Sequence, residues 1–165
     1  PVLYVCNVDE ASAKDGNKYV DMVKEAVKDE EAEMLVVAAK IESEIAELES
    51  FEEREMFLSE LGLESSGVSR VIRSAYSLLN LETYFTAGVQ EVRAWTYPKG
   101  AKAPQAAAVI HTDFEKGFIR AEVIKYADFV KYGSENGCKE AGKLGVEGKE
   151  YVVQDGDIMH FRFNV

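Results

Sequence analysis

Two short apolar runs near the start of the chain are separated by an amphipathic segment. Residues 2–6 (VLYVC) and 34–38 (MLVVA) are almost wholly apolar, and apolar side chains recur at helical spacing from Tyr19 to Val27. Strand, helix and strand of these lengths are typical of a βαβ unit with parallel strands. Near-continuous apolar strands are expected where helices cover both faces of a sheet. The pattern therefore predicts an α/β unit at the start of the chain.

The next segment, residues 40–80, is rich in glutamate, and apolar residues recur along it at intervals close to one helical turn. Ile41, Ile45 and Leu48 fall near helical spacing, so one or two acidic amphipathic helices are expected. After the cap region at residues 65–67, a second apolar stripe over residues 68–79 predicts another helix. The crowded carboxylates are expected to be solvated helix faces, with acid–base or metal chemistry as the alternative.

Residues 81–165 contain shorter runs divided by turn residues. Residues 82–85, 89–97, 118–126, 151–153 and 158–163 read as strands, with turns at residues 86–88 and 154–157. Pro104 opens a short Ala-rich helix at a position where its missing N–H costs nothing. Strands around one short helix suit a β-grasp domain of the α+β class. The expected domains are therefore residues 1–80 and 81–165.

Charge and composition narrow the function classes. The net charge of −11 is uneven: residues 1–80 carry 8 Lys and Arg against 18 Asp and Glu, whereas residues 81–165 carry 11 against 12. Nucleic acid is therefore expected to approach only a local basic face of the second half. No apolar run reaches ~18 residues, and no secretory signal pattern is present, so no membrane partner is expected. Cys6 and Cys138 are expected to be free thiols in a reducing cytosol.

Two residues stand where open α/β sheets place their ligands. Such sheets bind ligands beyond the carboxyl ends of their strands, and Asn7 and Ala39 occupy those ends here. An Asn at a strand end is more often a turn residue that caps local backbone. Spacing alone therefore leaves both a capping and a ligand-binding role open for Asn7.

Several long strings resemble one family closely. They are NVDE at residues 7–10, AAKIE at 38–42, FTAG at 85–88, EVRAW at 91–95, IHTDFEKGFIRAEV at 110–123 and VQDGDIMHFRFNV at 153–165. They resemble the YchF group of P-loop ATPases, relatives of the Obg GTPases, and residues 81–165 are similar to the TGS domain of that group. The resemblance implies the carboxyl-terminal part of a cytoplasmic, ribosome-associated nucleotide-binding hydrolase. It also implies ATP or GTP with Mg²⁺ in the intact parent and no cofactor required by this portion.

The same resemblance assigns candidate site residues. GTPases of the superfamily use an N-K-x-D block, whose Asp accepts hydrogen bonds from guanine, and this chain has Val8 at the Lys position and Glu10 at the Asp position. The YchF group is similar in this respect and prefers ATP, while Asn7 keeps a donor and an acceptor for a purine edge. The backbone N–H of Ala39 and the stem of Lys40 are expected near the base. No catalytic residue and no metal ligand are expected in this chain.

Other features carry competing interpretations. The string G-x-x-x-x-G-K at residues 137–143 imitates a phosphate loop, but Leu144 replaces the Ser/Thr and no apolar strand precedes it, so a short surface helix is expected. His111 and His160 are expected to be structural. Seven basic residues and three aromatic ones are candidate RNA contacts, with solubilising charge and core packing as the alternatives: Arg93, Lys99, Lys102, Lys116, Arg120, Lys125, Arg162, Trp95, Tyr97 and Phe114.

Three functions remain open at this level. The leading expectation is the carboxyl-terminal portion of a YchF-type ATPase, inactive in hydrolysis by itself because it lacks a phosphate loop and a magnesium site. The alternative is a free-standing β-grasp module that binds RNA or the ribosome without enzymatic activity. Self-association is a third expectation, because a two-stranded βαβ fragment leaves sheet edges unpaired.

Overall fold

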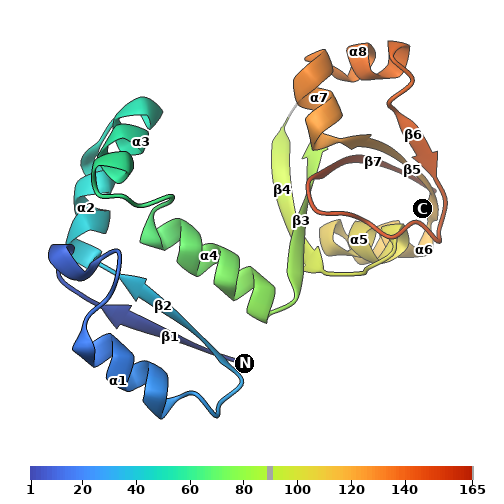
Figure 1. Cartoon of the computed structure of the whole chain (residues 1–165). Helices are drawn as coiled ribbons and strands as arrows, with labels where there is room; N and C mark the ends of the chain where they lie inside the picture. The colour runs from blue at the N-terminus through green and yellow to red at the C-terminus, as the bar shows by residue number, and fades with distance from the viewer. Residues whose placement is uncertain (89–90, 165) are drawn as a thin grey trace. The chain divides into compact units, whose positions relative to one another are not determined.

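The computed structural model describes residues 1–88 and 91–164, and the chain divides into two compact units (Figure 1). The first spans Pro1–Leu79 and the second Asn80–Val165. Each unit has its own cluster of buried apolar side chains. Among the described residues, no helix combines the length and the apolar character needed to cross a membrane.

The first unit begins with two parallel strands. β1 (Val2–Asn7) pairs with β2 (Ala32–Val37) over six residues, and α1 (Lys18–Ala26) connects them. Asn17 starts α1, because its side-chain oxygen accepts hydrogen bonds from the backbone N–H groups of Tyr19 and Val20, at 3.0 and 3.3 Å. The predicted order of strand, helix and strand is confirmed, and β2 starts two residues earlier than its apolar run.

Three helices complete the first unit. They are α2 (Ala39–Glu47), α3 (Phe51–Glu60) and α4 (Gly67–Leu78). Ser50 and Glu53 form a capping box at the start of α3, and Ser66 caps α4. Both acidic helices and the Val68–Leu79 helix are confirmed. Ile41 and Ile45 from α2 are buried with Ala13 and Ala38, so α2 anchors the small core of this unit.

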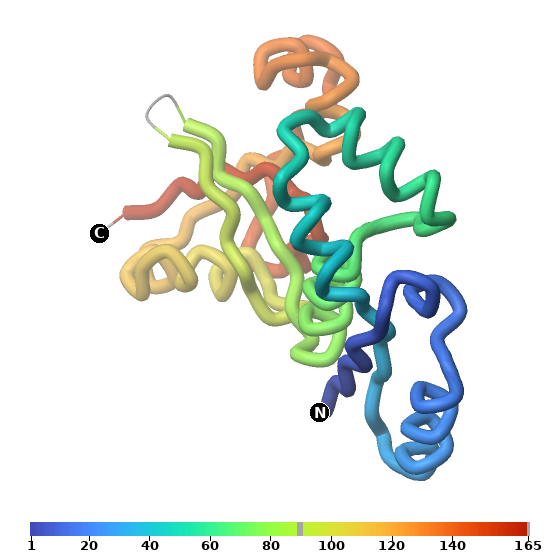
Figure 2. Tube along the Cα trace, turned by 90° about the vertical axis from the view of Figure 1, so that its left-hand side faces the viewer, coloured from blue at the N-terminus to red at the C-terminus, as the bar shows by residue number. Residues whose placement is uncertain are grey.

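The second unit is built on a five-stranded mixed sheet. Its strands are β3 (Leu81–Ala87), β4 (Val92–Pro98), β5 (Phe118–Lys125), β6 (Gly145–Glu147) and β7 (Asp157–Phe163), in the order β4-β3-β7-β5-β6. β3 and β7 are parallel and the other neighbours are antiparallel. The β3–β4 hairpin is visible as two adjacent strands in both views (Figure 1 and Figure 2).

One face of this sheet packs on a helix. α5 (Ala103–Ile110) contributes Ala103, Ala106 and Ala107, all fully buried, to the core of the unit. The strands contribute larger side chains, among them Tyr84 and Phe161, whose rings meet edge to face at 5.7 Å. Small residues on the helix allow it to approach the bulky strand side chains closely, which explains the Ala-rich sequence.

Several local predictions for this unit were wrong. Residues 151–153 form no strand, but only an isolated bridge between Val152 and Lys102. The turn predicted at residues 86–88 is wrong for residues 86 and 87, because β3 continues through Ala87. Val89, at the start of the predicted 89–97 strand, lies outside the described residues, and β4 begins at Val92. Three short elements were not predicted: α6 (Thr112–Lys116), α7 (Tyr126–Tyr132) and β6. A fourth, α8 (Glu135–Glu140), is the short surface helix expected near residues 137–143.

A buried carboxylate joins a loop of the second unit to its sheet. Asp157 has no exposed surface, and its oxygens accept hydrogen bonds from Lys125 Nζ at 2.6 Å, the Tyr151 hydroxyl at 2.6 Å and the backbone N–H of Gln154 at 3.0 Å. Burial alone would lower the pKa of Lys125, but its hydrogen bonds with Asp157 and Tyr151 raise the pKa above the ordinary value. The network ties the 148–156 loop to the ends of β5 and β7.

We expect the Asp157→Asn variant to destabilise the second unit by about 2 kcal/mol, because the amide has one acceptor oxygen where the carboxylate uses both. The single Trp, at position 95, lies in this unit, so its fluorescence reports unfolding of the unit in urea. Glu140→Gln removes the same charge from an exposed position and is the matched control, with an expected change below about 0.5 kcal/mol. Equal midpoints for the two variants would contradict the structural role of Asp157.

Candidate functional site

The carboxyl ends of β1 and β2 meet at one edge of the parallel sheet. Asn7 is paired with Val37 in the last step of the register, and the backbone N–H of Val8 donates to the Val37 carbonyl at 2.9 Å. The chain then enters a short 3-10 helix after β1 and α2 after β2. Two loops and the start of one helix are thereby brought together.

The Asn7 side chain bridges the two strand ends. Its Oδ1 accepts a hydrogen bond from the backbone N–H of Ala39, the first residue of α2, at 3.0 Å. Ala38, which precedes the helix, has no side chain able to cap it, so Asn7 supplies that acceptor from another strand. Because Ala39 N–H is a donor, the amide orientation of Asn7 is fixed with its oxygen toward the helix.

This bond leaves the other half of the amide available. Asn7 is exposed, and no hydrogen bond joins its Nδ2 group to another residue in the described part of the chain. An amide held at its oxygen presents its N–H₂ group in a defined direction, so it can donate to an external acceptor without losing conformational freedom on binding. Of the two hydrogen-bonding groups of the Asn7 amide, the acceptor oxygen is therefore used within the fold, and the donor Nδ2 group remains available.

Val8 has a packing role. Its side chain is partly buried and packs against the core cluster that contains Ala38, Ile41 and Ile45. An apolar residue at this position stabilises the α2 contact, whereas a Lys would place a charge against that cluster. The valine at position 8 is thus explained by its packing against the core of the first unit.

The residues after Val8 divide between local structure and solvent. Asp9 caps the 3-10 helix Glu10–Ser12, since its carboxylate accepts from Ser12 N at 3.0 Å. Sequence reasoning missed this role of Asp9, although Asp before a short helical turn is a signal for it. Glu10 is exposed; its backbone carbonyl accepts from Ala13 N–H at 3.1 Å, and its side chain makes no hydrogen bond or ion pair among the described residues. Its carboxylate is an unengaged acceptor beside the strand end.

Ala39 and Lys40 lie in the first turn of α2. The Ala39 N–H, expected near a base, is already engaged by Asn7 and holds that side chain. Lys40 is exposed, with its ammonium 3.9 Å from Glu44 in the next turn. The structure therefore brings Asn7 and Ala39 into direct contact, while Glu10 and Lys40 are exposed charges nearby in the sequence.

A cavity of about 380 Å³ lies beside Asn7, between β1 and α1. Tyr4, Cys6, Asn7 and Val8 line it from the strand, and Asn17 from the start of α1 is among the residues opposite. Ligand cavities in proteins are lined mainly by apolar side chains with a few polar groups, and this cavity has residues of both kinds. Asn7 and Val8 line this cavity, while Glu10, Ala39 and Lys40 do not.

α2 also holds the start of α4. Both carboxylate oxygens of Glu42 accept from the first N–H groups of α4, Gly67 at 2.6 Å and Val68 at 3.1 Å. A Cβ at position 67 would lie 2.8 Å from a Val37 methyl carbon, so only Gly allows this approach. The expectation that the connector carboxylates are solvated is wrong for Glu42, which is a cap between helices.

The candidate RNA contacts of the second unit separate into paired and unpaired groups. Tyr97 is fully buried and cannot stack on a base, which corrects that expectation. Trp95 is partly buried, donates to the Thr86 hydroxyl at 2.9 Å and has the Arg93 guanidinium 4.2 Å from its ring centre. Arg120 has no carboxylate within ion-pair distance among the described residues. Five further cations each have a carboxylate partner: Lys99, Lys102, Lys116, Lys125 and Arg162.

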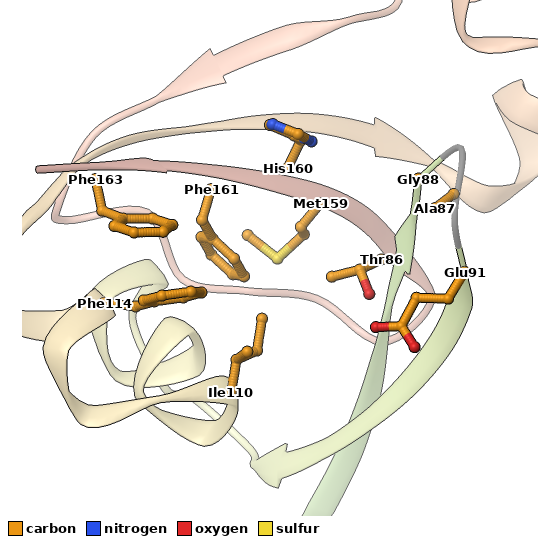
Figure 3. Close-up of a pocket in the computed structure, with 10 residues that line it drawn as sticks. All are labelled: Thr86, Ala87, Gly88, Glu91, Ile110, Phe114, Met159, His160, Phe161 and Phe163. Carbon is orange, nitrogen blue, oxygen red and sulfur yellow. The ribbon is translucent and has the colours of Figure 1, made fainter.

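A groove of about 520 Å³ opens between the sheet and α5–α6 (Figure 3). Phe114 and Phe163 stack at its wall with ring centres 3.7 Å apart, and Phe161, Met159 and Ile110 lie beside them. Phe114 therefore already has an aromatic partner within the fold. Thr86 and Glu91 provide polar groups at the hairpin end.

The histidines and the imitation phosphate loop have local roles. His111 Nδ1 accepts from the backbone N–H of Asp113 at 3.2 Å and caps α6, as expected for a residue at this junction. Residues 135–140 form α8, and Gly142 follows with φ +68, so the predicted surface helix ending at a Gly is confirmed. Within residues 1–88 and 91–164, no group of three or more His, Cys, Asp or Glu residues is arranged to hold a metal ion.

Comparison with known proteins gives consistent matches. The family model YchF-GTPase_C, described as a protein of unknown function (DUF933), matches residues 81–164. "Ribosome-binding ATPase YchF" from Haemophilus influenzae is 62% identical over 165 residues, which are 100% of this chain and 45% of that protein, and the protein of the same name from Bacillus subtilis is 60% identical with the same coverage. "Obg-like ATPase 1" from Pongo abelii is 47% identical, covering 99% of this chain and 42% of that protein.

The same relation holds in three dimensions. The structure of the Schizosaccharomyces pombe YchF GTPase is similar with a TM-score of 0.81 and 39% identity, covering 98% of this chain and 43% of that one. A GTP binding protein from Pyrococcus horikoshii shares the mixed α/β fold at a TM-score of 0.64. The chain thus spans about half the length of the relatives that it matches. The family model covers half of the chain, and together with these relatives it shows that the chain belongs to the YchF family.

Proposed function

We propose that the chain is the carboxyl-terminal portion of a ribosome-associated ATP- or GTP-binding P-loop ATPase of the cytoplasm. In this proposal the first unit supplies one side of a purine pocket and the second unit is a TGS interaction domain. The observation that supports it most is the Asn7 amide, fixed by Ala39 at the joint end of two parallel strands. The names of the relatives, ribosome-binding ATPase and Obg-like ATPase, agree with this proposal.

The chemistry of Asn7 suits a purine of either kind. Adenine and guanine both present N7 as an acceptor, and the free Nδ2 group of Asn7 is a donor. This contact anchors the ring without distinguishing the two bases. Discrimination would then depend on Glu10, whose carboxylate can accept from an exocyclic amine, and on Lys40, whose stem can cover the ring. Val8 helps to hold the loop through its core contact.

The hydrolytic chemistry of the proposed parent lies outside these residues. Mg²⁺ would neutralise charge on the phosphates of a bound nucleotide when present. The described residues provide no cluster for that ion, and the G-x-x-x-x-G-K string forms a surface helix. This chain contributes binding and orientation of the base through Asn7, Ala39 and their neighbours. Catalytic residues are therefore assigned to none of its positions.

The second unit supports a β-grasp assignment through its arrangement. A mixed sheet with a parallel β3–β7 pair at its centre curves over α5, and β4 and β6 form its edges. A TGS domain in this position would serve as a binding surface. The separate core of the unit also favours the alternative function, a free-standing RNA- or ribosome-binding module without enzymatic activity.

Self-association is a further proposal for the first unit. Within the part of the chain that the structure describes, β1 pairs only with β2, and Val2 and Val5 on this strand are each 48% exposed. An unpaired apolar edge strand is a template for pairing with a second copy. Light scattering after gel filtration tests this proposal, and a monomer at high concentration would count against it.

We expect purine binding to depend on the nitrogen of Asn7. Asn7→Asp keeps the acceptor for Ala39 but replaces the donor, so adenosine binding should weaken by about tenfold or more with little change in stability. Saturation-transfer NMR with adenosine and with guanosine measures the weak binding of a partial pocket. Asn17→Asp is the matched control, since Asn17 lines the same cavity and caps α1. Equal losses for the two variants would contradict the assignment.

We expect the purified chain to show no Mg²⁺-dependent ATP turnover above that of its Asn7→Ala variant. The reason is that positioning and charge stabilisation of the phosphates require groups that these residues lack. Phosphate release over hours, measured with a coupled assay, decides the question. Turnover that disappears in the Asn7→Ala protein would overturn the assignment of hydrolysis to other parts of the parent.

Ribosome binding separates the leading function from its alternative. We expect the chain to co-sediment with bacterial ribosomes, because the bacterial relatives that match the whole of this chain are named for ribosome binding. If binding changes on addition of ATP, the nucleotide-linked function is supported. If binding is unaffected by ATP, the independent module is supported, and a chain that stays in the supernatant contradicts both.

A further inference from the structure

β7 lies between β3 and β5 in the sheet, yet it pairs along its whole length with only one of them. β5 pairs with it from its first residue to its last, whereas β3 pairs with it at a single position, Phe85 with Ile158. Continued along both strands, this register places Ala87, the last residue of β3, opposite His160. Among the residues that the structure describes, the edge of β7 that faces β3 therefore has no strand partner beyond Ile158.

The end of the β3–β4 hairpin is closed on itself and does not supply that partner. The backbone N–H of Gly88 donates to the Glu91 carbonyl at 2.9 Å. By register, residues 161–163 of β7 run past the end of β3. A strand without a neighbour presents a row of N–H and C=O groups, which is a ready template for pairing with another chain. The main-chain groups of residues 161–163 on this side are therefore available to a further strand.

An apolar groove lies along this opening (Figure 3). It is the groove of about 520 Å³ that is lined by the end of β3, by β7 and by α5 and α6. Ile110, Phe114 and Phe163 line it and are only half-buried, so apolar surface remains uncovered there. Figure 3 shows the side chains of Met159, Phe161 and Phe163 on the side of β7 that faces α5 and α6. A strand added to β7 would lay alternate side chains against this apolar surface, because side chains alternate between the faces of a strand.

The groove has a carboxylate at its hairpin end. Glu91 is exposed, and its side chain makes no hydrogen bond or ion pair among the described residues. The described residues that line the groove include no Lys or Arg, and the nearest cation along the chain, Arg93, has its guanidinium 4.2 Å from the ring centre of Trp95. Figure 3 shows the Glu91 side chain extending toward Thr86, inside the groove. A cationic side chain of a partner is the charge complement of this end.

We propose that this groove binds an extended peptide segment of another protein, which adds a strand to the free edge of β7. Main-chain hydrogen bonds to residues 161–163 supply affinity, and alternate apolar side chains of the peptide cover Ile110 and Phe114. A Lys or Arg at the end of the peptide nearest the hairpin pairs with Glu91. A small apolar molecule could fill the groove, but it would leave the strand edge unpaired. The groove belongs to the second unit, so peptide binding is independent of the purine site proposed around Asn7.

The test selects random octapeptides, displayed on phage, against the whole chain. We expect the enriched peptides to share a run of alternating apolar residues with a Lys or Arg at one end. Pro should be absent from that run, because it cannot donate to a ladder of hydrogen bonds. The most enriched peptide is then synthesised with a fluorescent label, and anisotropy gives its dissociation constant. Hydrogen exchange locates the peptide, since the amides of residues 161–163 should exchange more slowly in the complex.

N-methylation of the peptide separates strand addition from simple apolar contact. In a strand, the N–H groups of alternate residues face the same neighbour. Methylation of the set that faces β7 removes those hydrogen bonds and should weaken binding by about tenfold, whereas methylation of the other set should change the affinity by less than about twofold. Equal effects of the two methylated peptides would contradict strand addition.

A charge reversal tests the hairpin end of the groove. We expect Glu91→Lys to weaken binding of the cationic peptide by about fivefold, and a peptide with Glu in place of its Lys or Arg to recover the affinity. Glu140→Lys makes the same change of charge at an exposed position of α8 and is the matched control, which should bind the peptide as the unmodified chain does.

Three further results would overturn the peptide groove. They are a selection that enriches no octapeptide, equal affinity of the enriched peptide for the Glu91→Lys and Glu140→Lys proteins, and slowed hydrogen exchange that lies outside the groove. A dimer in light scattering that Glu91→Lys dissociates would also overturn it, because the groove would then hold a second copy of this chain. The purine-binding experiment on Asn7 depends on none of these outcomes.

Discussion

The hydrogen bond from the Ala39 N–H to the Asn7 side chain is the interaction on which the first unit depends. It joins the end of one parallel strand to the helix that follows the other, at 3.0 Å. One turn further along that helix, Glu42 accepts from the first N–H groups of α4. α2 is therefore held at its first residue by β1 and itself holds the start of α4. A ligand that engages Asn7 would act on a residue already coupled to this framework.

The two carboxylates Glu42 and Asp157 follow the same physical rule in the two units. Glu42 accepts backbone N–H groups from Gly67 and Val68, and Asp157 accepts one from Gln154. Each carboxylate also has a partner distant in sequence, Gly67 for Glu42 and Lys125 for Asp157. From the sequence, Glu42 looked like one of many solvated glutamates, and Asp157 looked like a turn residue. The turn is real, since Asp157 N donates to Gln154 O at 3.0 Å. The buried network around its side chain depends on Lys125, 32 residues away.

Local patterns predicted most of the long elements and failed where tertiary contacts decide. β1, α1, α2, α4 and β5 follow directly from apolar periodicity. The predicted 151–153 strand is instead held by two backbone bonds to Ala101 and Ala103, about 50 residues earlier, so its extended conformation supports no sheet ladder. At the site, the strand-end position of Asn7 was readable, but its oxygen partner was not, because only the fold brings Ala39 to it. The Nδ2 group of Asn7 is the part of the side chain that remains free to bind a ligand.

Composition fixes how much charge a unit carries, and the fold decides which charged side chains meet. A balance of 11 cationic to 12 acidic residues in residues 81–165 gave no reason to single out one of them. Register decides this: a two-residue period places Arg120, Glu122, His160 and Arg162 on one face, where Glu122 pairs with Arg162 and also attracts Arg120. A one-residue shift of β5 against β7 would turn Arg120 and Glu122 toward the core. The buried face, led by Phe161 and Met159, therefore fixes the charged face as well.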